Sequence, residues 1–461
     1  MKGRIGMSIK IKGAAKFLLD ENVSAKANMA MNKSELINLW HNFSFGMSRL
    51  TIEETDEFIF SVGNAKKPEL GDGGYAINID KDGIFILADN EKNLIYGFMT
   101  LLDMIHMTEP GCAELESCTL TGSPKIKIRM AHFCVFPDTK LWELEKFIKL
   151  CAMLKYSHVI VEFWGMLKLA CMKELSWEHG FDKERIRPII KTANELGLEI
   201  VPMFNHWGHA AASRVMHGKH VVLDQNPSLQ YLFSDDGWRW RIERSDVREL
   251  LKKIRAELEE LCGEGEYFHI GCDEAYGFGH TKNETDEITV FINEVNAELK
   301  QDGRKAIMWA DMLLSPREGD AYECNAPDME SERYIIARLS KDIIVADWQY
   351  NIKKVPVKTS LALKEAGFNV LICPWDVSGE SSDACVGTAK KYGLDGVIHT
   401  TWHTLSSGYP FVTRTAIGCM NDKKMSWLDC ALKTAELMRR VSPGSDYTKS
   451  GWARHEIGTR W

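Results

Sequence analysis

The chain has 461 residues, of which 45% are hydrophobic and 26% are charged, and this composition is typical of a folded globular protein. Its formal net charge of -8 provides no basic field for a phosphate backbone, so we expect no nucleic-acid partner. No apolar run approaches the roughly 18 residues that span a bilayer, so we also expect no membrane contact and a cytoplasmic location. The length predicts a barrel-sized domain with a smaller one, and a homodimer is one assembly that it allows.

The N-terminal quarter of the chain predicts a small α+β domain, which we assign to residues 1–124. The segments 55–63, 74–80 and 83–90 alternate apolar and polar residues with turn residues between them, as strands do. Residues 91–107 have the periodicity of an amphipathic helix, and residues 24–45 also show helical periodicity.

From residue 125 to 461 short β-rich runs alternate with helical segments. The eight strand candidates are 128–136, 157–164, 198–205, 267–274, 305–312, 341–350, 368–376 and 394–402. Nearly continuous apolar strands in repeated βα units indicate a parallel sheet that is buried on both faces. Eight such units predict an α/β fold, a (β/α)8 TIM barrel preceded by the small α+β domain. A doubly wound open sheet is the alternative, but no G-x-G-x-x-G follows the first strand.

The twelve cysteines are scattered through the chain, and no C-x-x-C pair indicates zinc or redox chemistry. We therefore interpret them as reduced and mostly buried thiols.

Polar and aromatic residues follow the predicted strands, at the ends where TIM barrels place their active sites. In chain order they are Asn205, His206, His209, Asp273, Glu274, Trp309, Asp311, Trp348, Tyr350, Trp375, Asp376, Trp402 and His403. Each of the last four strands ends in a tryptophan, and an indole face packs well on the apolar face of a sugar ring. A single Trp could simply plug the barrel, but four together favour a carbohydrate site.

Two adjacent acids, Asp273 and Glu274, end the fourth strand in the segment "YFHIGCDE". Neighbouring strand residues point to opposite faces, so both acids can address one pocket only if the backbone turns there. Two close carboxylates hold their protons differently, which suits one as a proton donor and the other as a charged stabiliser. An ordinary acid pair at the start of a helix is the alternative.

The segment "HIGCDE" resembles the H-x-G-G-D-E signature of glycoside hydrolase family 20, the β-N-acetylhexosaminidases, with Cys272 at the second Gly. The segment "IRMAHFCVFP" resembles the family's first barrel strand with its sugar-binding Arg at Arg129, and "VPMFNHWGHA" resembles its third-strand motif with His209 at the motif's His. The "WAD", "WQY" and "TTWHT" segments resemble the stretches that form the acetamide pocket, and the N-terminal segment resembles the small domain that precedes the barrel.

This resemblance implies a retaining, exo-acting hydrolase that removes terminal β-linked GlcNAc or GalNAc. Most glycoside hydrolases use two carboxylates, but this family is a substrate-assisted exception, in which the 2-acetamido oxygen is the nucleophile and an oxazolinium forms. Glu274 would then protonate the leaving oxygen, and Asp273 would orient the acetamide N–H. The resemblance implies a carbohydrate substrate, no cofactor, no metal, and sugar-binding roles for Arg129, His209, Trp309, Trp348, Tyr350, Trp375, Asp376 and Trp402.

The sequence departs from the family pattern at several sugar-binding positions. The H-x-x-D-D stretch after the second strand is "VEFWGML" here, and Asn205 and Trp207 replace an Asp and a Pro of the third-strand motif. The acid after the last strand is replaced by Thr404. Recognition of the outer hydroxyls is therefore altered, and the choice between GlcNAc and GalNAc stays open.

Two rival functions remain. A metal-dependent hydrolase or isomerase could use His206, His209, His269, Asp273 and Glu274 as ligands, although no third ligand follows His206 and His209 at metal spacing. A non-catalytic amino-sugar-binding protein would keep the Trp pocket, but it would have no need for a proton donor beside a charge stabiliser.

Overall fold

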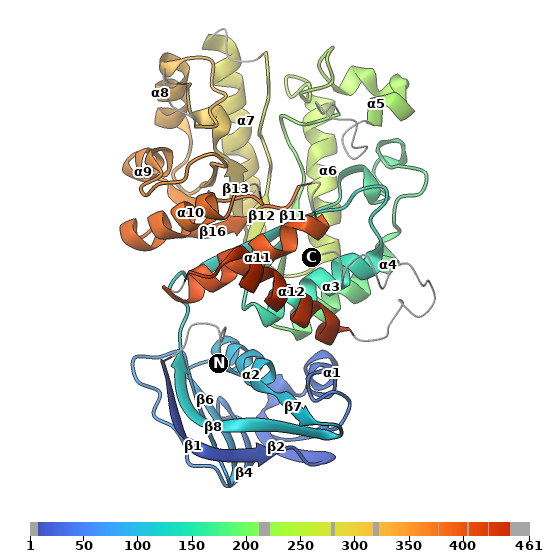
Figure 1. The fold of residues 1–461 in the computed structure, drawn as a ribbon. Helices are drawn as coiled ribbons and strands as arrows, with labels where there is room; N and C mark the ends of the chain where they lie inside the picture. Colours follow the sequence, from blue (N-terminus) through green and yellow to red (C-terminus); the bar gives the residue numbers. More distant parts are fainter. Residues whose placement is uncertain are drawn as a thin grey trace.

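The computed structural model describes residues 8–211, 222–277, 282–316, 322–376, 378–402, 405–422 and 424–442. An open sheet within residues 8–122 is followed by a closed barrel of eight parallel strands with helices around it (Figure 1). This arrangement confirms the predicted α/β fold class, a TIM barrel preceded by a small α+β domain. Among the described residues no helix is long and apolar enough to cross a membrane.

The N-terminal sheet has the strand order β1-β8-β5-β6-β4-β2-β3, with β7 paired to β8. Its neighbours are antiparallel except for the parallel pair β2 and β3. The strands are β1 (Ser8–Leu18), β2 (Asn22–Asn28), β3 (Arg49–Thr55), β4 (Ile59–Gly63), β5 (Tyr75–Asp80), β6 (Gly83–Ala88), β7 (His106–Glu109) and β8 (Cys112–Gly122).

Two helices, α1 (Ser34–Phe43) and α2 (Glu91–Met104), cover one face of this sheet. The aromatic rings of Trp40, Phe60 and Phe98 meet there and are fully buried. The helical periodicity of residues 24–45 is only half right, because residues 22–28 form β2. Val23, Ala25 and Ala27 are buried alternately, which is the period of a strand.

The barrel has the strand order β9 to β16 and closes by pairing β16 with β9. Its strands are β9 (Ile128–Cys134), β10 (His158–Glu162), β11 (Glu199–Met203), β12 (Tyr267–His269), β13 (Lys305–Trp309), β14 (Ile344–Trp348), β15 (Asn369–Cys373) and β16 (Gly396–His399). Each lies within one of the eight predicted strand segments. His403, predicted to follow the eighth strand, lies outside the described residues.

Helices surround the barrel strands (Figure 1). They are α3 (Leu141–Met153), α4 (Lys183–Glu195), α5 (Val222–Gln225), α6 (Ser245–Cys262), α7 (Lys282–Gln301), α8 (Met329–Arg338), α9 (Lys358–Glu365), α10 (Gly379–Tyr392), α11 (Leu405–Met420) and α12 (Trp427–Val441). Inward-facing side chains such as Met130, Ile160 and Ile398 fill the barrel, so its interior is a packed core.

The small domain packs under the amino-terminal ends of the barrel strands, where α1 and α2 meet α3, α4 and α12 (Figure 1). Across this boundary Lys433 forms an ion pair with Asp103. Arg440 donates hydrogen bonds to the carbonyls of Phe43 at 2.6 Å and Ile105 at 2.9 Å. The carboxyl ends of the strands therefore lie on the side of the barrel away from the small domain.

Candidate active site

The backbone turns sharply after β12, in the segment that carries the adjacent acids. Gly271, Cys272 and Glu274 have φ angles of 66°, 76° and 48°, a region that L-residues other than glycine rarely adopt. At Gly271 the close approach also requires glycine, because a Cβ there would lie 2.2 Å from Oδ1 of Asn205. The strand has therefore ended and the backbone has turned before the two acids, which is the condition expected if both are to address one pocket.

His209 connects the two acids. Its Nε2 lies 3.0 Å from Oε2 of Glu274 and 3.8 Å from Oδ2 of Asp273. The loop that carries His209 packs closely on the turn that contains Asp273 and Glu274, which we call the acid turn. A Cβ on Gly208 of this loop would lie 1.7 Å from the carbonyl oxygen of Asp273. The loop after β11 therefore fixes the imidazole against both carboxylates.

Asp273 is only 5% exposed, and its two carboxylate oxygens have different surroundings. Oδ2 lies near His209, whereas Oδ1 is buried and has no hydrogen-bond partner within the described ranges. Burial raises the pKa of Asp273 to about 7; the charge of His209 opposes this shift, and those of Asp311, Glu274 and Glu162 add to it. A buried acceptor without a donor is costly unless a ligand supplies one.

Asp311 supports the turn from the loop after β13. Its carboxylate accepts hydrogen bonds from the backbone N–H of Glu274 (3.0 Å), Nδ2 of Asn325 (2.9 Å) and Nε1 of Trp348 (3.1 Å). Burial raises the pKa of Asp311 to about 6, and although these hydrogen bonds oppose the shift, the charge of Glu274 adds to it. Asp311 thus holds the backbone of one acid and the indole of the aromatic wall.

The aromatic residues predicted at the strand ends form a continuous wall beside the acids. The rings of Trp309 and Trp402 lie 5.7 Å apart, and Tyr350 lies 5.1 Å from both Trp348 and Trp375. Nε1 of Trp402 donates to the hydroxyl of Tyr350 at 2.8 Å, which joins the two groups. Trp348 of this wall and the backbone N–H of Glu274 both donate to the carboxylate of Asp311, so the wall and the acids share one site.

Asp376 follows this wall directly in the chain. Its Oδ2 lies against α11, where a Cβ on Gly408 would come within 2.7 Å. This contact directs the carboxylate toward a helix outside the barrel strands. Asp376 therefore lies next to the first turns of α11.

Arg129 is the one predicted sugar-binding residue at the other end of the barrel. Its guanidinium donates to the backbone carbonyls of Ile126 at 2.7 Å and Lys155 at 2.7 and 2.8 Å, and it lies over the ring of Tyr96 in α2. It is the second residue of β9, so it faces the small domain and not the strand ends that carry the acids. This placement corrects the prediction: Arg129 is a buried structural residue, and we leave it out of the site.

Three side chains near the acids have no role predicted from the sequence. Trp238 packs on His209 with a ring distance of 5.0 Å and on Tyr276 with 5.1 Å, so these two rings extend the aromatic wall past the acids. Asp311, the third, supports the turn as described above. The sequence signals are a Trp-rich irregular stretch near residue 235 and an acid two residues after a strand-ending Trp, and neither is specific.

The loop after β10 is apolar at the position where the family pattern has an acid. Phe163, Trp164 and Met166 are buried, and Trp164 stacks on Trp240 at 6.2 Å. The acid of this strand is Glu162, which is fully buried and lies near His132 inside the barrel. The start of this loop therefore packs aromatic and aliphatic side chains into the core and offers no carboxylate.

The ligand set of the rival metal-dependent enzyme is not brought together. Nδ1 of His206 lies 2.7 Å from the carbonyl of Phe204, and Nδ1 of His269 accepts from the N–H of Gly271 at 3.0 Å. Only His209 of the three histidines contacts the acids in the part of the chain that the structure describes.

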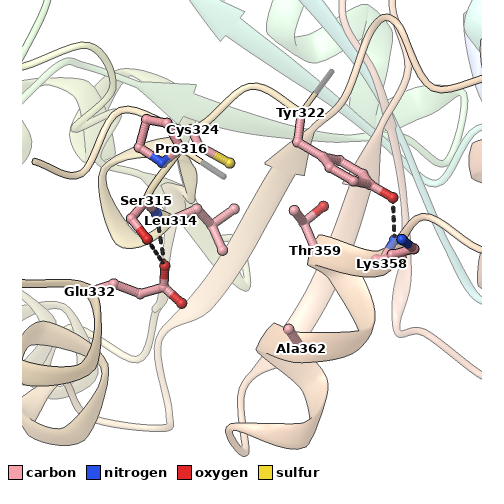
Figure 2. A pocket seen from close by; sticks show the side chains of 9 residues that line it. All are labelled: Leu314, Ser315, Pro316, Tyr322, Cys324, Glu332, Lys358, Thr359 and Ala362. Atoms are coloured by element: carbon pink, nitrogen blue, oxygen red, sulfur yellow. Dashed lines mark hydrogen bonds between the residues drawn. The ribbon is translucent and has the colours of Figure 1, made fainter. Parts of the chain in front are cut away.

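A second pocket lies outside the barrel, between the loop after β13 and α9 (Figure 2). Its polar groups are already engaged, because Ser315 donates to Glu332 and the N–H of Lys358 donates to the hydroxyl of Tyr322 (Figure 2). It shares no residue with the acids or the aromatic wall.

Two family models match the chain over the regions just described. The model for "Glycosyl hydrolase family 20, catalytic domain" matches residues 165–378, and that for "Glycosyl hydrolase family 20, domain 2" matches residues 8–121. The chain belongs to glycoside hydrolase family 20. The matched ranges cover most of the sheet domain and the barrel segment that carries the acid turn.

Known proteins resemble the chain at low identity. A lacto-N-biosidase from Bifidobacterium bifidum is 24% identical over 314 residues, which are 62% of this chain but only 25% of that protein. An exo β-N-acetylglucosaminidase from Vibrio harveyi has a TM-score of 0.70 at 14% identity, covering 95% of this chain and 76% of that one. A β-N-acetylhexosaminidase from Bacteroides fragilis has a TM-score of 0.68 at 16% identity, covering 98% and 96%. The two structural matches support the fold.

Proposed function

We propose that this family 20 protein is a retaining, exo-acting β-N-acetylhexosaminidase that removes terminal β-linked N-acetylhexosamine with the help of the substrate's own acetamide. The observation that carries the proposal is the pair of adjacent acids turned toward His209, with the buried Oδ1 of Asp273 lacking a donor among the described residues. An acetamide N–H would supply that donor.

In the first step the acetamide oxygen attacks the anomeric carbon while the bond from that carbon to the leaving oxygen breaks. Glu274 gives its proton to the leaving oxygen, and the sugar becomes a cationic oxazolinium. Asp273 holds the acetamide N–H through Oδ1, so it orients the attacking oxygen and stabilises the developing positive charge. A carboxylate with a raised pKa is drawn to its charged form when this cation appears beside it.

In the second step Glu274 acts as a base. It takes a proton from water, the water oxygen attacks the anomeric carbon, and the oxazoline ring opens to restore the acetamide. The configuration at the anomeric carbon is retained because it is inverted twice. The contact of His209 with Oε2 of Glu274, at 3.0 Å, would keep this carboxyl group directed at the leaving-group side in both steps.

The aromatic wall supports an amino-sugar substrate. Trp309 packs on Trp402, and Trp348 donates to Asp311, which supports the turn that carries both acids; a pyranose and its acetamide methyl can pack on these indoles and exclude water. The names of the relatives, an exo β-N-acetylglucosaminidase and a β-N-acetylhexosaminidase, agree with this substrate class. The loop after β10 is apolar where the family pattern has an acid, which leaves both GlcNAc and GalNAc as candidates.

Hydrolysis of aryl glycosides tests the proposal. We expect release of the aryl alcohol from the β-N-acetylglucosaminide, the β-N-acetylgalactosaminide or both, and none from the plain β-glucoside, which lacks the nucleophile. Efficient cleavage of the β-glucoside would contradict the acetamide mechanism. Saturable binding of N-acetylglucosaminides without any product would support the non-catalytic sugar-binding protein instead.

Three further predictions remain proposals. A domain division at residues 124 and 125 is supported by the end of β8 at Gly122 and the start of β9 at Ile128. A cytoplasmic location is supported by twelve cysteines that are all free thiols. A homodimer is supported by the exposed apolar side chains of Trp427, Leu428 and Leu432 on α12, and sedimentation would test it.

A further inference from the structure

Three side chains that the proposed reaction does not use meet inside the barrel below its mouth. They are His132 and Cys134 on β9 and Glu162 at the end of β10, and all three are buried. Sγ of Cys134 lies 3.6 Å from Nε2 of His132 and 3.1 Å from Oε2 of Glu162, and these last two atoms lie 3.4 Å apart. We call these three residues the interior triad.

The strand geometry accounts for the triad. Side chains two residues apart on a strand point to the same face, so His132 and Cys134 follow Met130 into the barrel interior. Cys134 is paired with Glu162 in the register of β9 and β10, which places the carboxylate beside the thiol. The three groups are therefore fixed by two neighbouring strands and not by a loop.

The separations match the edges of a tetrahedral zinc site. Zinc binds Cys sulfur at about 2.3 Å and His nitrogen or carboxylate oxygen at about 2.0–2.1 Å, so tetrahedral angles place sulfur about 3.5 Å from either atom and nitrogen about 3.3 Å from oxygen. Two of the three edges of the interior triad agree with these values to within about 0.1 Å, and the edge from sulfur to oxygen is shorter, at 3.1 Å. Only a small movement of Cys134 or Glu162 would open that edge.

The donor set also fits such an ion. A thiolate and an imidazole favour zinc and similar divalent transition metals over magnesium or calcium, which prefer oxygen ligands. A thiolate and a carboxylate buried side by side would repel each other, and a divalent cation between them removes that cost. Without a metal, the Cys134 thiol donates to Glu162 and the carboxylate also pairs with His132.

We propose that the interior triad binds one divalent transition-metal ion of the zinc class, which ties β9 to β10 under the aromatic wall. Tetrahedral sites with three protein ligands leave a fourth position for water or another ligand. His269 is not a fourth ligand, because its Nδ1 accepts from the N–H of Gly271, so the neutral ring carries its proton on Nε2. That Nε2 has no hydrogen-bond partner among the described residues and can donate to whatever occupies the fourth position.

Metal content tests the proposal on the full-length protein, purified without a chelator and with any affinity tag removed. We expect about one zinc per chain in the wild type and a loss of most of it in Cys134→Ser and Glu162→Gln. Cys373→Ser is the matched control, since Cys373 is also a buried thiol inside the barrel and its Sγ donates to the carbonyl of Leu371 on its own strand. Metal-free wild type after growth with added zinc, or equal zinc in Cys134→Ser and wild type, would overturn the proposal.

Spectroscopy keeps the test decisive if the variants fold poorly. Cobalt-loaded wild type should show a thiolate-to-cobalt charge-transfer band in the near ultraviolet, which Cys373→Ser should keep and Cys134→Ser should lose. X-ray absorption at the zinc edge of the wild type should find one sulfur at about 2.3 Å and nitrogen or oxygen neighbours at about 2.0 Å. A zinc shell without sulfur would contradict the interior triad. Both readouts are independent of hydrolase activity, so they stand or fall separately from the proposed function.

Discussion

The pKa of a buried carboxylate is shifted in opposite directions at the two ends of the barrel. At the amino-terminal end burial acts to raise the pKa of Asp103, but the charge and hydrogen bond of Lys433, together with the charges of Lys155 and Arg440, outweigh it, and the pKa is lowered. At the carboxyl end burial raises the pKa of Asp273 to about 7, and neighbouring carboxylates add to the shift. The same physical effect, desolvation, is therefore outweighed at one end and only partly opposed, by His209, at the other.

This difference separates structural from functional charge. At the interface between the two domains Arg129 and Arg440 also find carbonyl acceptors, so the buried charges there hold the chain together. At the mouth the backbone has positive φ angles at Cys272 and Glu274, and Asp273 has an oxygen without a donor among the described residues. Strain and unsatisfied groups of this kind cluster where a protein acts on a ligand.

The largest effect is expected from Glu274→Gln at the mouth. It should reduce hydrolysis of substrates with poor leaving groups by roughly 10²–10⁴-fold, because such leaving groups need a proton, and it should affect activated aryl glycosides much less. Steady-state kinetics on both substrate types measures this. Glu365→Gln, on the exposed side of α9, is the control that should leave both rates unchanged. Equal losses on the two substrates would remove Glu274 from the role of acid.

At the other end, Lys433→Met should lower the free energy of unfolding by about 3–5 kcal/mol, because it leaves the buried Asp103 without its partner. Urea denaturation would measure this loss. Adding Asp103→Asn to Lys433→Met should restore part of the stability, since the unpaired charge is then gone. A double variant less stable than Lys433→Met would show that the ion pair is not the source of the effect.

Asp273→Asn should make the protein more stable while it impairs catalysis. The folded pKa of about 7 lies above the ordinary value of 3.8, so the wild type loses stability as the pH rises from about 4 to about 7 and the buried carboxyl ionises. Asn avoids this, so its advantage should grow over that range by roughly 4 kcal/mol, which is about 1.4 kcal/mol for each unit of the pKa shift. Thermal melting at pH 5 and pH 8 measures the trend, with the exposed Asp302→Asn as control. A stability difference independent of pH would contradict the raised pKa.

The smallest effect concerns Cys272, which stands where the family signature has glycine. With φ at 76° it is strained, so Cys272→Gly should be more stable than Cys272→Ala by about 1 kcal/mol, although glycine is the smaller side chain. Chemical denaturation of the two variants decides this. The usual order, with alanine ahead of glycine, would show that the turn holds no strain at this position.

Much of the fold can be predicted from the sequence, because apolar runs of strand length alternate with amphipathic helices from residue 125 onward. The alternation of buried and exposed residues that marks a strand is harder to recognise in residues 22–28, because the small alanines there are also common in helices. The acids and the aromatic wall are also predictable, since they follow strands directly. The motif led to a wrong role for Arg129 because a match in sequence does not show at which end of the strand a residue lies, and Arg129 is near the amino-terminal end of β9. Asp311 and the interior triad depend on contacts between strands that a linear pattern does not contain.

The central claim is tested most directly by the affinity of a thiazoline mimic of the cyclised intermediate for the wild type and for Asp273→Asn. If Asp273 stabilises the cation and holds the ring nitrogen, the mimic should bind the wild type tightly and lose roughly 3–4 kcal/mol of binding free energy in the variant, as expected when a preorganised charge partner is removed from a dry site. Isothermal titration calorimetry measures both affinities. Equal binding to the two proteins would show that the adjacent acids do not act on the acetamide group.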